Sequence, residues 1–476
     1  MEESGEECEV VVIGGGLAGL TAARTIVRHD SSLRVALLEA DRRLGGRVLS
    51  VKAGGRHFDL GAHWVGSTQS RVVGLVRQFN LGLRPQLLAG RKLMQVGDLK
   101  VRSYDSVLPS LGSWLALLEL GWLTSQLDLL AGQVNTRDPV ASLAEGEQLD
   151  SLTVSCWLSL HTRFQAVRDC VTAAVRTTFG VEPSQISVLF FLTIIKSAGG
   201  VSQLFEATEG AAQEFVVEGG AMSIVESLYE DIKSEVNVVM GEPVSTVEQD
   251  RDGSVFVLTG GGRIIKCCRV VVCVPPCQQA RINWIPALRP RKHLAVQSCQ
   301  FGLLIKVILE FPQPYWRQEG YSGELVSSGS PLCISFDDSQ ADSPALLTFI
   351  GGREAFFWAE KPEKELKAAV VRQLAECFGD WAYDYTNIRV KTWADQTFIG
   401  GSPVAIPAVG SLFLYPALRE AHHRVHFAGT ETATEWLGYM EGAVQSGVRA
   451  GLEVLNILKP QSLSPSELAV SRSEGL

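Results

Sequence analysis

The sequence predicts an α/β fold that contains a dinucleotide-binding unit, and two neighbouring apolar runs predict that unit. The run EVVVIG (9–14) ends in glycines and is followed by a helical pattern from Leu17 to Arg28. A second apolar run, RVALLEA (34–40), comes next. Strand, glycine-rich turn, helix and strand in this order are typical of the βαβ unit of dinucleotide-binding folds.

The glycines of this turn have the spacing G-x-G-x-x-G, at Gly14, Gly16 and Gly19. The first permits a tight turn, the second lets the backbone approach a pyrophosphate, and the third lets the helix pack closely on the strand. Glu39 follows about twenty residues later, where a carboxylate accepts both ribose hydroxyls of an adenosine. The combination favours dinucleotide binding over a glycine-rich turn in some other α/β protein.

Composition limits the classes of protein that fit. The 476 residues suffice for two or three domains, or for two interleaved ones. Hydrophobic residues make up 46% and charged residues 20%, which excludes general disorder. The net charge of −9, without a basic block, argues against a nucleic-acid partner. Ten cysteines without a CxxC pair indicate no metal site, and we expect free thiols in a reducing, cytoplasmic compartment.

The remaining elements follow from periodicity and from turn residues. Strands are predicted at 236–240, 254–258, 264–274, 301–311, 345–350 and 424–428, and helices at 222–232, 364–378 and 438–458. Glycines 260–262 are predicted to form a hairpin turn between the second and third of these strands. The tail 459–476, with proline, serine and mixed charges, is predicted to be disordered.

The acidic N-terminus resembles no signal peptide, and the sequence lacks a run of roughly eighteen apolar residues, so we expect no spanning helix. The stretch from Leu108 to Leu130 comes closest. Leu111, Leu115, Leu118 and Trp122 share one face of the predicted helix, and we expect that face to be buried. The alternative is an exposed apolar patch that touches a membrane or a partner.

Four further segments contain glycines together with charged or aromatic residues. They are ADRRLGGR (40–47), DLGAHWVG (59–66), FAGTE (427–431) and GYMEGAV (438–444). With the βαβ unit, these segments resemble the flavin-containing amine oxidases, a family that includes monoamine, polyamine and L-amino-acid oxidases. The runs 65–71 and 426–451 are most similar to monoamine oxidase. The similarity extends from about residue 9 to 458 and is weaker in the middle.

The resemblance implies a Rossmann-like FAD-binding domain built from discontinuous segments and a second, α+β substrate domain. The expected FAD-binding segments are 9–85, 212–295 and 400–458, and the expected substrate segments are 86–211 and 296–399.

The resemblance also implies how FAD is held. The expected cofactor-binding residues are Gly14, Gly16, Gly19, Glu39, Arg42, Arg47, Gly61, Ala62, His63, Trp64, Val244, Glu431 and Met440. In the family, the residue matching Arg47 contacts the flavin-side phosphates, and the backbone at Val244 meets the adenine. Glu431 and Met440 match positions at the ribityl chain and the pyrimidine edge. Asp41 stands where the family often has arginine, so Arg42 is the expected replacement.

Lys306, Trp393 and Tyr439 are the expected catalytic residues, and Gln213 and Tyr439 the expected substrate contacts. The family's lysine holds a water against flavin N5 and its tryptophan stacks on the flavin. Simpler alternatives are an edge-strand Lys306 that snorkels to water, a core Trp393 and an exposed loop Gln213. His63 has a structural alternative and a functional one, in which it binds a second amine or tunes a proton transfer.

Two departures from monoamine oxidase bear on function. Those enzymes attach FAD to a cysteine that follows a glycine pair, whereas this chain has Ser402 after Gly400 and Gly401. We therefore expect non-covalent FAD. Pro403 replaces one of the two tyrosines of the family's aromatic cage, and Tyr439 matches the other.

The resemblance thus implies oxidation of a small amine, most simply a monoamine, to an imine, with oxygen reduced to hydrogen peroxide. A polyamine oxidase is the first alternative and needs carboxylates such as Glu209, Glu214 or Glu324 to pair with distant ammonium groups. Two further alternatives remain. An L-amino-acid oxidase needs an arginine that binds the carboxylate of the substrate, and a flavin-binding protein with decayed catalysis would act as an interaction module. Expected partners are the amine and oxygen, with a homodimer or peripheral membrane contact left open.

Overall fold

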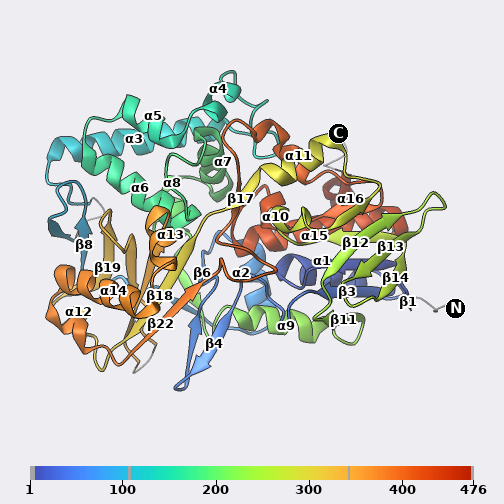
Figure 1. Ribbon diagram of the computed structural model, residues 1–476, viewed down its shortest axis with the longest axis horizontal. Coiled ribbons are helices and arrows are strands. Elements are labelled where there is room, and N and C mark those ends of the chain that lie inside the picture. Colours follow the sequence, from blue (N-terminus) through green and yellow to red (C-terminus); the bar gives the residue numbers. More distant parts are fainter. Residues whose placement is uncertain (1–5, 106–108, 341–342, 473–476) are drawn as a thin grey trace.

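The computed structural model describes residues 6–105, 109–340 and 343–472 (Figure 1). A five-stranded parallel sheet forms the nucleotide-binding half. Its strands in spatial order are β11 (Val236–Met240), β3 (Val35–Glu39), β2 (Val10–Ile13), β15 (Arg269–Val272) and β24 (Val425–Phe427). The apolar runs that predicted β2 and β3 are buried throughout, as expected for strands covered on both faces.

Helices α1 (Leu17–His29), α9 (Met222–Ile232) and α15 (Met440–Leu458) pack beside this sheet. Glycines bring α1 and α15 close together. A Cβ on Gly447 would lie 2.4 Å from the Ala18 carbonyl oxygen, and one on Gly451 would lie 2.9 Å from the Thr25 Cβ. The last predicted helix therefore packs along the first one, although the two are far apart in the sequence.

A second sheet extends the nucleotide-binding half. Its order is β1 (Glu6–Glu7), β14 (Ile264–Cys267), β13 (Val255–Thr259), β12 (Val244–Gln249) and β16 (Asn283–Ile285). The predicted hairpin between 254–258 and the next strand is confirmed. The single strand predicted at 264–274 is wrong, because β14 and β15 belong to different sheets. The amides of Cys268 and Arg269 both bind the Glu9 carbonyl at this break.

The other half contains a seven-stranded sheet. Its order is β22 (Asn387–Thr392), β18 (Leu304–Glu310), β21 (Ala345–Gly351), β20 (Ile334–Asp337), β19 (Tyr321–Ser327), β8 (Arg91–Gln95) and β9 (Val101–Tyr104). Helices α12 (Tyr315–Gln318), α13 (Arg353–Ala359) and α14 (Glu363–Phe378) accompany it. The fold is thus the predicted α/β type with a Rossmann-like sheet and a separate mixed sheet, whereas the predicted domain boundaries stay a prediction.

A helical layer covers the upper left of Figure 1. It comprises α3 (Trp114–Gln133), α4 (Gly146–Ser151), α5 (Val154–His161), α6 (Gln165–Phe179), α7 (Val188–Ala198) and α8 (Val201–Phe205). Helix α7 is its buried centre, since all of its residues except Lys196 are buried.

The expectation that α3 buries the face with Leu115, Leu118 and Trp122 is wrong. These side chains are 47%, 62% and 45% exposed, and Trp114 is 70% exposed. The helix instead buries Ala116, Leu123, Leu127 and Ala131 in the core cluster that contains α7. Both stripes of the helix are apolar, so periodicity alone does not decide which one packs. Leu111 is buried ahead of the helix, and Leu108 lies outside the described residues.

Shorter elements connect the two halves. They are the hairpin β4 (Ser50–Ala53) with β5 (Arg56–Asp59), the sheet β6 (Trp64–Val65), β10 (Phe215–Val217) and β7 (Leu83–Pro85), the pair β17 (Cys299–Phe301) and β23 (Ala405–Pro407), and helices α2 (Ser70–Gln78), α10 (Pro276–Gln279) and α11 (Pro290–Ser298). Short 3-10 turns occupy Asp380–Asp384, Leu412–Leu418, Thr430–Thr432 and Pro460–Ser462. None of the helices in the described ranges is long and apolar enough to cross a bilayer.

The prediction of disorder over 459–476 is wrong as far as residue 472. Helix α16 (Pro465–Arg472) packs on α15, and Glu467 forms an ion pair of 2.9 Å with His29 of α1. Helix α16 begins with a capping box. The Ser464 amide donates to the Glu467 carboxylate, and the Glu467 amide donates to the Ser464 hydroxyl. That S-x-x-E pattern was the signal in the sequence. Residues 473–476 lie outside the described part.

Candidate active site

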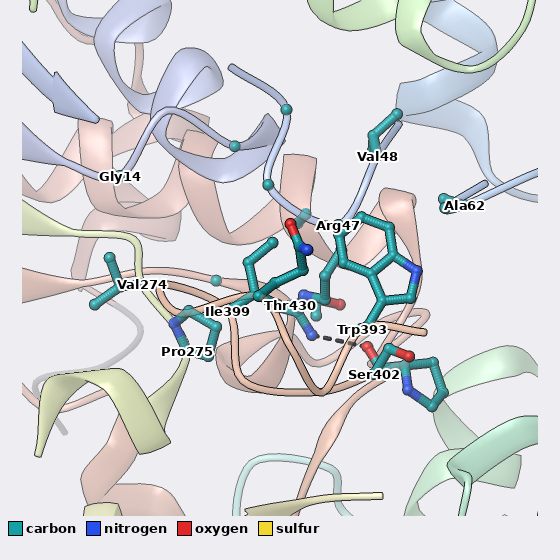
Figure 2. A pocket seen from close by; sticks show the side chains of 18 of the residues that line it. Gly14, Arg47, Val48, Ala62, Val274, Pro275, Trp393, Ile399, Ser402 and Thr430 are labelled. Carbon is teal, nitrogen blue, oxygen red and sulfur yellow. Dashed lines mark hydrogen bonds between the residues drawn. The ribbon is translucent and has the colours of Figure 1, made fainter. Parts of the chain in front are cut away.

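A cavity of about 820 Å³ begins at the carboxyl ends of the parallel strands and reaches the seven-stranded sheet. Figure 2 shows some of the side chains that line it. The volume is in the range of about 300–1,000 Å³ that is usual for small-molecule and cofactor sites. The following predicted site residues line it: Gly14, Gly16, Glu39, Arg47, Gly61, Ala62, His63, Trp64, Gln213, Val244, Lys306, Trp393, Tyr439 and Met440. Gly19, Arg42 and Glu431 do not.

The three glycines of the turn differ in what they do. Gly14 has φ +104°, a conformation that side chains disfavour. A Cβ on Gly19 would lie 1.8 Å from the Gly14 carbonyl oxygen, so this glycine permits helix–strand packing and makes no cavity wall. A Cβ on Gly16 would meet nothing closer than the Gly45 carbonyl oxygen at 3.8 Å, so a side chain there would project into the cavity. This open backbone surface suits a phosphate group.

Glu39 stands at the end of β3 with its carboxylate fixed by two backbone amides. Oε2 accepts from Gly15 N at 2.6 Å, and Oε1 accepts from Asp41 N at 2.8 Å. Burial raises the pKa of Glu39, and the two amide bonds oppose that shift. Each oxygen keeps a further lone pair for a donor such as a ribose hydroxyl.

Arg43, and not Arg42, places a guanidinium at the cavity wall. Arg42 is exposed and outside the cavity wall, whereas Arg43 lines the cavity. The carbonyl oxygens of Leu44, Gly46 and Val48 bind the Arg43 guanidinium, whose central carbon lies 5.8 Å from the Trp393 ring centre.

Glu431 acts on Arg47 instead of reaching the cavity. Arg47 donates to both carboxylate oxygens of Glu431, at 2.5 and 3.0 Å, and to the Pro403 carbonyl at 2.9 Å. Two parallel bonds of this kind fix the plane of the guanidinium. Glu431 thus orients the arginine whose other side lines the cavity near Ser402 and Thr430 (Figure 2).

Lys306 is a buried residue of an inner strand, which rules out the edge-strand alternative. Strand β18 lies between β21 and β22, and Lys306 is 5% exposed. Its Nζ donates to the carbonyls of Asp59 at 2.8 Å and Gly61 at 2.6 Å, which leaves one of its three protons for the cavity. Burial lowers the pKa of Lys306 to about 8, while the carboxylates of Asp59 and Asp338 oppose the shift.

Trp393 lines the same part of the cavity and is almost completely buried. Its indole N–H donates to the Leu60 carbonyl at 3.1 Å, which fixes the ring beside the segment of Gly61 to Trp64.

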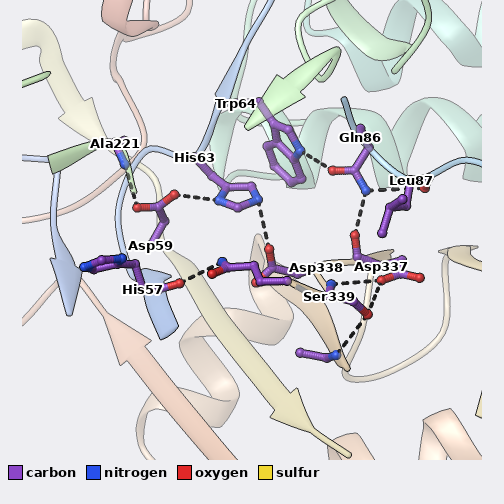
Figure 3. A network of polar contacts seen from close by, with 12 residues as sticks. His57, Asp59, His63, Trp64, Gln86, Leu87, Ala221, Asp337, Asp338 and Ser339 are labelled. Carbon is purple, nitrogen blue, oxygen red and sulfur yellow. Dashed lines mark hydrogen bonds and ion pairs between the residues drawn. The ribbon is translucent and has the colours of Figure 1, made fainter. Parts of the chain in front are cut away.

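His63 and Trp64 belong to a polar network that joins the two halves (Figure 3). His63 contacts Asp59, and the Trp64 indole donates to Gln86 at 2.8 Å, which in turn donates to the Asp337 carbonyl at 2.7 Å. Asp338 is a member that sequence reasoning missed, because no motif surrounds it.

The part of the cavity remote from Glu39 is largely apolar. Its walls come from α6, α7, β18, β21 and the segments before β10 and α15. We call it the apolar chamber and define it as Trp64, Thr177, Thr178, Phe179, Ile194, Ala212, Gln213, Leu304, Phe349, Leu437 and Tyr439. Sequence reasoning named only three of these residues, since the others carry ordinary core patterns.

The residues present fit FAD. The glycine turn and Glu39 offer a phosphate and ribose site at one end, and Lys306, Trp393 and the N-terminus of α15 surround the other. The Ser402 hydroxyl and Gln213 Oε1 are buried polar atoms without a hydrogen-bond partner within the described residues, and both residues line the cavity. Unpaired buried polar atoms indicate a missing polar ligand.

Comparisons with known proteins agree with this geometry. The family model of flavin containing amine oxidoreductase matches residues 17–455. A probable flavin-containing monoamine oxidase A of Dictyostelium discoideum is 32% identical over 449 residues, which are 94% of this chain and 97% of that protein.

Two solved structures have the same fold. Cyclohexylamine oxidase from Brevibacterium oxydans IH-35A is 28% identical with a TM-score of 0.87, covering 95% of this chain and 99% of that one. A putrescine oxidase bound to putrescine is 24% identical with a TM-score of 0.89, covering 94% and 99%, and shows the fold alone. The chain therefore belongs to the flavin-containing amine oxidoreductase family and is an FAD-dependent amine oxidase.

Proposed function

We propose that this chain oxidises a small monoamine, with FAD bound non-covalently. The observation that carries the proposal is the composition of the apolar chamber, whose defining residues include neither a carboxylate nor an arginine. A neutral amine with an apolar substituent fits such walls, whereas a second ammonium group or a carboxylate on the substrate has no counter-charge there.

The polyamine alternative loses its support because its candidate carboxylates are engaged elsewhere. Glu214 accepts from the amides of Ser67 at 2.7 Å and Gly210 at 2.9 Å. Glu324 is paired with Lys92 at 2.9 Å. Neither residue, nor Glu209, lines the cavity. The carboxylates that do line it are Glu39, Asp41, Glu242 and Asp395, which lie outside the apolar chamber.

The side chains of the cavity position the amine and supply polar contacts to it. Bound FAD supplies the two-electron acceptor for the amine, and oxygen then takes the electrons and leaves as hydrogen peroxide. The Tyr439 ring and Pro403 flank the cavity beside the start of α15, and we assign them as the two walls around the amine nitrogen. Gln213 Oε1 accepts an N–H of the amine. Phe349, Ile194 and Leu304 exclude water, which strengthens these polar contacts.

An anaerobic spectral titration tests the proposal. The purified yellow protein is mixed with aromatic monoamines, aliphatic monoamines, spermine derivatives and amino acids. Bleaching of the flavin band by monoamines, and much less by the other groups, is the expected result. Bleaching by spermine derivatives alone would overturn the monoamine assignment. A flavin that no amine bleaches would favour the interaction-module alternative.

We also propose that the exposed face of α3, defined as Trp114, Leu115, Leu118, Trp122 and Leu129, binds a lipid surface. The two carboxylates of this helix are turned to internal contacts. Glu119 accepts from the amides of Arg163 and Phe164, and Asp128 accepts from the Val201 amide. Tryptophan and leucine on an uncharged face suit the membrane interface.

Sedimentation with phosphatidylcholine/phosphatidylserine vesicles checks this second proposal. The protein is expected to pellet with the vesicles, and Trp114→Ser with Leu118→Ser to abolish pelleting. The matched control is Leu160→Ser on α5, an equally exposed single leucine. A dimer in analytical ultracentrifugation that the double variant dissociates would instead assign the face to a homodimer.

All ten cysteines lie within the described residues and are free thiols. This supports the cytoplasmic location that we propose, because free thiols persist in reducing compartments. Spontaneous disulfide formation in the protein isolated without reductant from its native cells would contradict it.

A further inference from the structure

His63 lies between two buried carboxylates, one on each side of its ring (Figure 3). Its Nδ1 is 2.9 Å from Asp59 Oδ2, and its Nε2 is 3.5 Å from Asp338 Oδ1. His63 is 5% exposed, Asp59 is 3% exposed and Asp338 is 1% exposed. The ring is therefore buried between two carboxylates, one at the end of the connecting strand β5 and one just after β20 of the seven-stranded sheet.

Because both ring nitrogens face carboxylates, the arrangement favours a ring that has a proton on each nitrogen. A neutral imidazole has one N–H and one lone pair. In either tautomer, one nitrogen would turn its lone pair toward a carboxylate oxygen, which is repulsive where the dielectric constant is low. Only the doubly protonated ring donates to both sides. Asp338 Oδ1 has no hydrogen-bond partner within the described residues, and His63 Nε2 faces it at 3.5 Å as an ion pair.

The charges around His63 are otherwise balanced. Arg56 donates to Asp338 Oδ2 at 2.6 Å, and Lys306 donates to the Asp59 carbonyl at 2.8 Å. Two carboxylates and these two cations sum to zero. The neighbouring Asp337 is turned away, toward the Trp316 indole and the Arg317 guanidinium. A protonated His63 thus leaves one net positive charge at the cavity wall.

The pKa of the Asp59 carboxyl is shifted in the direction that a cationic neighbour would produce. Burial by itself would raise its pKa, but the hydrogen bond and charge of His63, the Ser50 hydroxyl and Lys306 together lower the pKa below its usual value.

We propose that Asp59 and Asp338 hold His63 as an imidazolium, which serves with Lys306 as a second cation for oxygen reduction. The proposal rests on the proposed function of this site. Oxygen takes two electrons and one proton from the reduced flavin and a second proton from solvent, to give hydrogen peroxide. The first electron makes superoxide, an anion, and a fixed cation nearby stabilises it. His63 keeps both protons throughout, and Asp338 is a positioning residue that acts through His63.

The first test observes the ring directly. The holoenzyme is labelled with ¹⁵N-histidine, and the His63 signals are assigned by difference from His63→Gln. We expect two N–H nitrogens on His63 between about pH 6 and 8, the range in which free histidine loses its charge. His426 is the internal comparison, since its Nδ1 is 2.9 Å from Glu453 while its Nε2 has no hydrogen-bond partner among the residues that the structure describes. A neutral His63 ring at pH 7 would overturn the proposal.

The second test removes the outer carboxylate. Asp338→Asn should deprive His63 of its second N–H and slow reoxidation about tenfold, which is less than the loss of a group that touches the developing charge directly. Asp337→Asn is the matched control, because it neutralises an adjacent buried carboxylate that does not face His63. This control should leave both the ¹⁵N signals and reoxidation unchanged.

Reoxidation is measured after photochemical reduction of the flavin, so the result is independent of the amine. Unchanged reoxidation in Asp338→Asn, together with unchanged ¹⁵N signals, would overturn the role of Asp338. Normal reoxidation kinetics with no amine able to reduce the flavin would instead overturn the proposed function alone.

Discussion

Arg47 and Glu431 form a two-bond ion pair between the glycine-rich segment after β3 and the segment that leads into α15. The Arg47–Glu431 distances are 2.5 and 3.0 Å, and the Glu431 side chain is 1% exposed. The pair joins the first and last parts of the nucleotide-binding half at the cavity wall. It holds Arg47 in one orientation before any ligand arrives, which reduces the entropic cost of binding.

Glu431→Gln should therefore lower the affinity for FAD by about tenfold or more, because the partly buried Arg47 guanidinium loses its counter-charge and its fixed plane. The measurement is the dissociation constant of FAD from fluorescence titration of the apoprotein. Glu435→Gln is the control, since Glu435 forms an exposed pair with Arg71 that contributes little. Equal affinities of Glu431→Gln and the parent protein would contradict the assigned role of Arg47.

Lys306→Met should slow reoxidation of the reduced enzyme far more than reduction by the amine. The ammonium faces the cavity with one free proton and stabilises negative charge on oxygen, whereas amine oxidation needs no such cation. Stopped-flow absorbance measures both steps separately, and a loss of about 100-fold in reoxidation alone is expected. If both steps slow equally, Lys306 has only a structural role.

Reoxidation should also fall as pH rises through about 8, the value to which burial lowers the pKa of Lys306. The protonated form is the active one, so activity is complete below this pH and lost above it. Lys306→Arg should remove this decline, because a guanidinium stays charged over the whole range. The pH profile of the reoxidation rate constant is the measurement, and a decline that persists unchanged in Lys306→Arg would assign it to another group.

FAD should leave the protein completely on precipitation with acid, because Ser402 offers no sulfur at the position where monoamine oxidases carry a cysteine. Absorbance of the supernatant at the flavin band measures the release. Yellow colour that stays with the washed pellet would show a covalent bond. Cys273, which also lines the cavity, is the control position, and Cys273→Ser should leave the release unchanged.

Tyr439→Leu should lower kcat/KM for the preferred amine by about tenfold, whereas Tyr439→Phe should remain close to the parent. The ring supplies an apolar wall and a negative face beside the amine nitrogen, and the hydroxyl is not needed for either effect. Steady-state oxygen consumption measures both variants. A similar loss in Tyr439→Phe would move the role from the ring to the hydroxyl.

Sequence reasoning predicted well wherever a signal lies within one short segment. The unit of β2, α1 and β3, the glycine turn and Glu39 follow one another within about thirty residues, as the βαβ unit requires. The start of α16 was predictable in the same way, since Ser464 and Glu467 form a capping box that the disorder prediction overlooked.

Predictions failed where packing between distant segments decides the outcome. Both stripes of α3 are apolar, so the burial of Leu123 and the exposure of Trp122 depend on where α7 lies. Arg43, and not Arg42, lines the cavity because the carbonyls of the following turn bind its guanidinium.

The sequence by itself determined the family, the cofactor and the local elements. Their signals are the spacing of glycines, the periodicity of apolar residues and the turn residues, and each of these lies within a short segment of the chain. Only the tertiary structure decided that His63 faces Asp59 and Asp338. It also decided that Lys306 is held by the carbonyls of Asp59 and Gly61. Interactions between charges depend on separations of a few ångströms and on exclusion of water, and folding sets both for residues far apart in the chain.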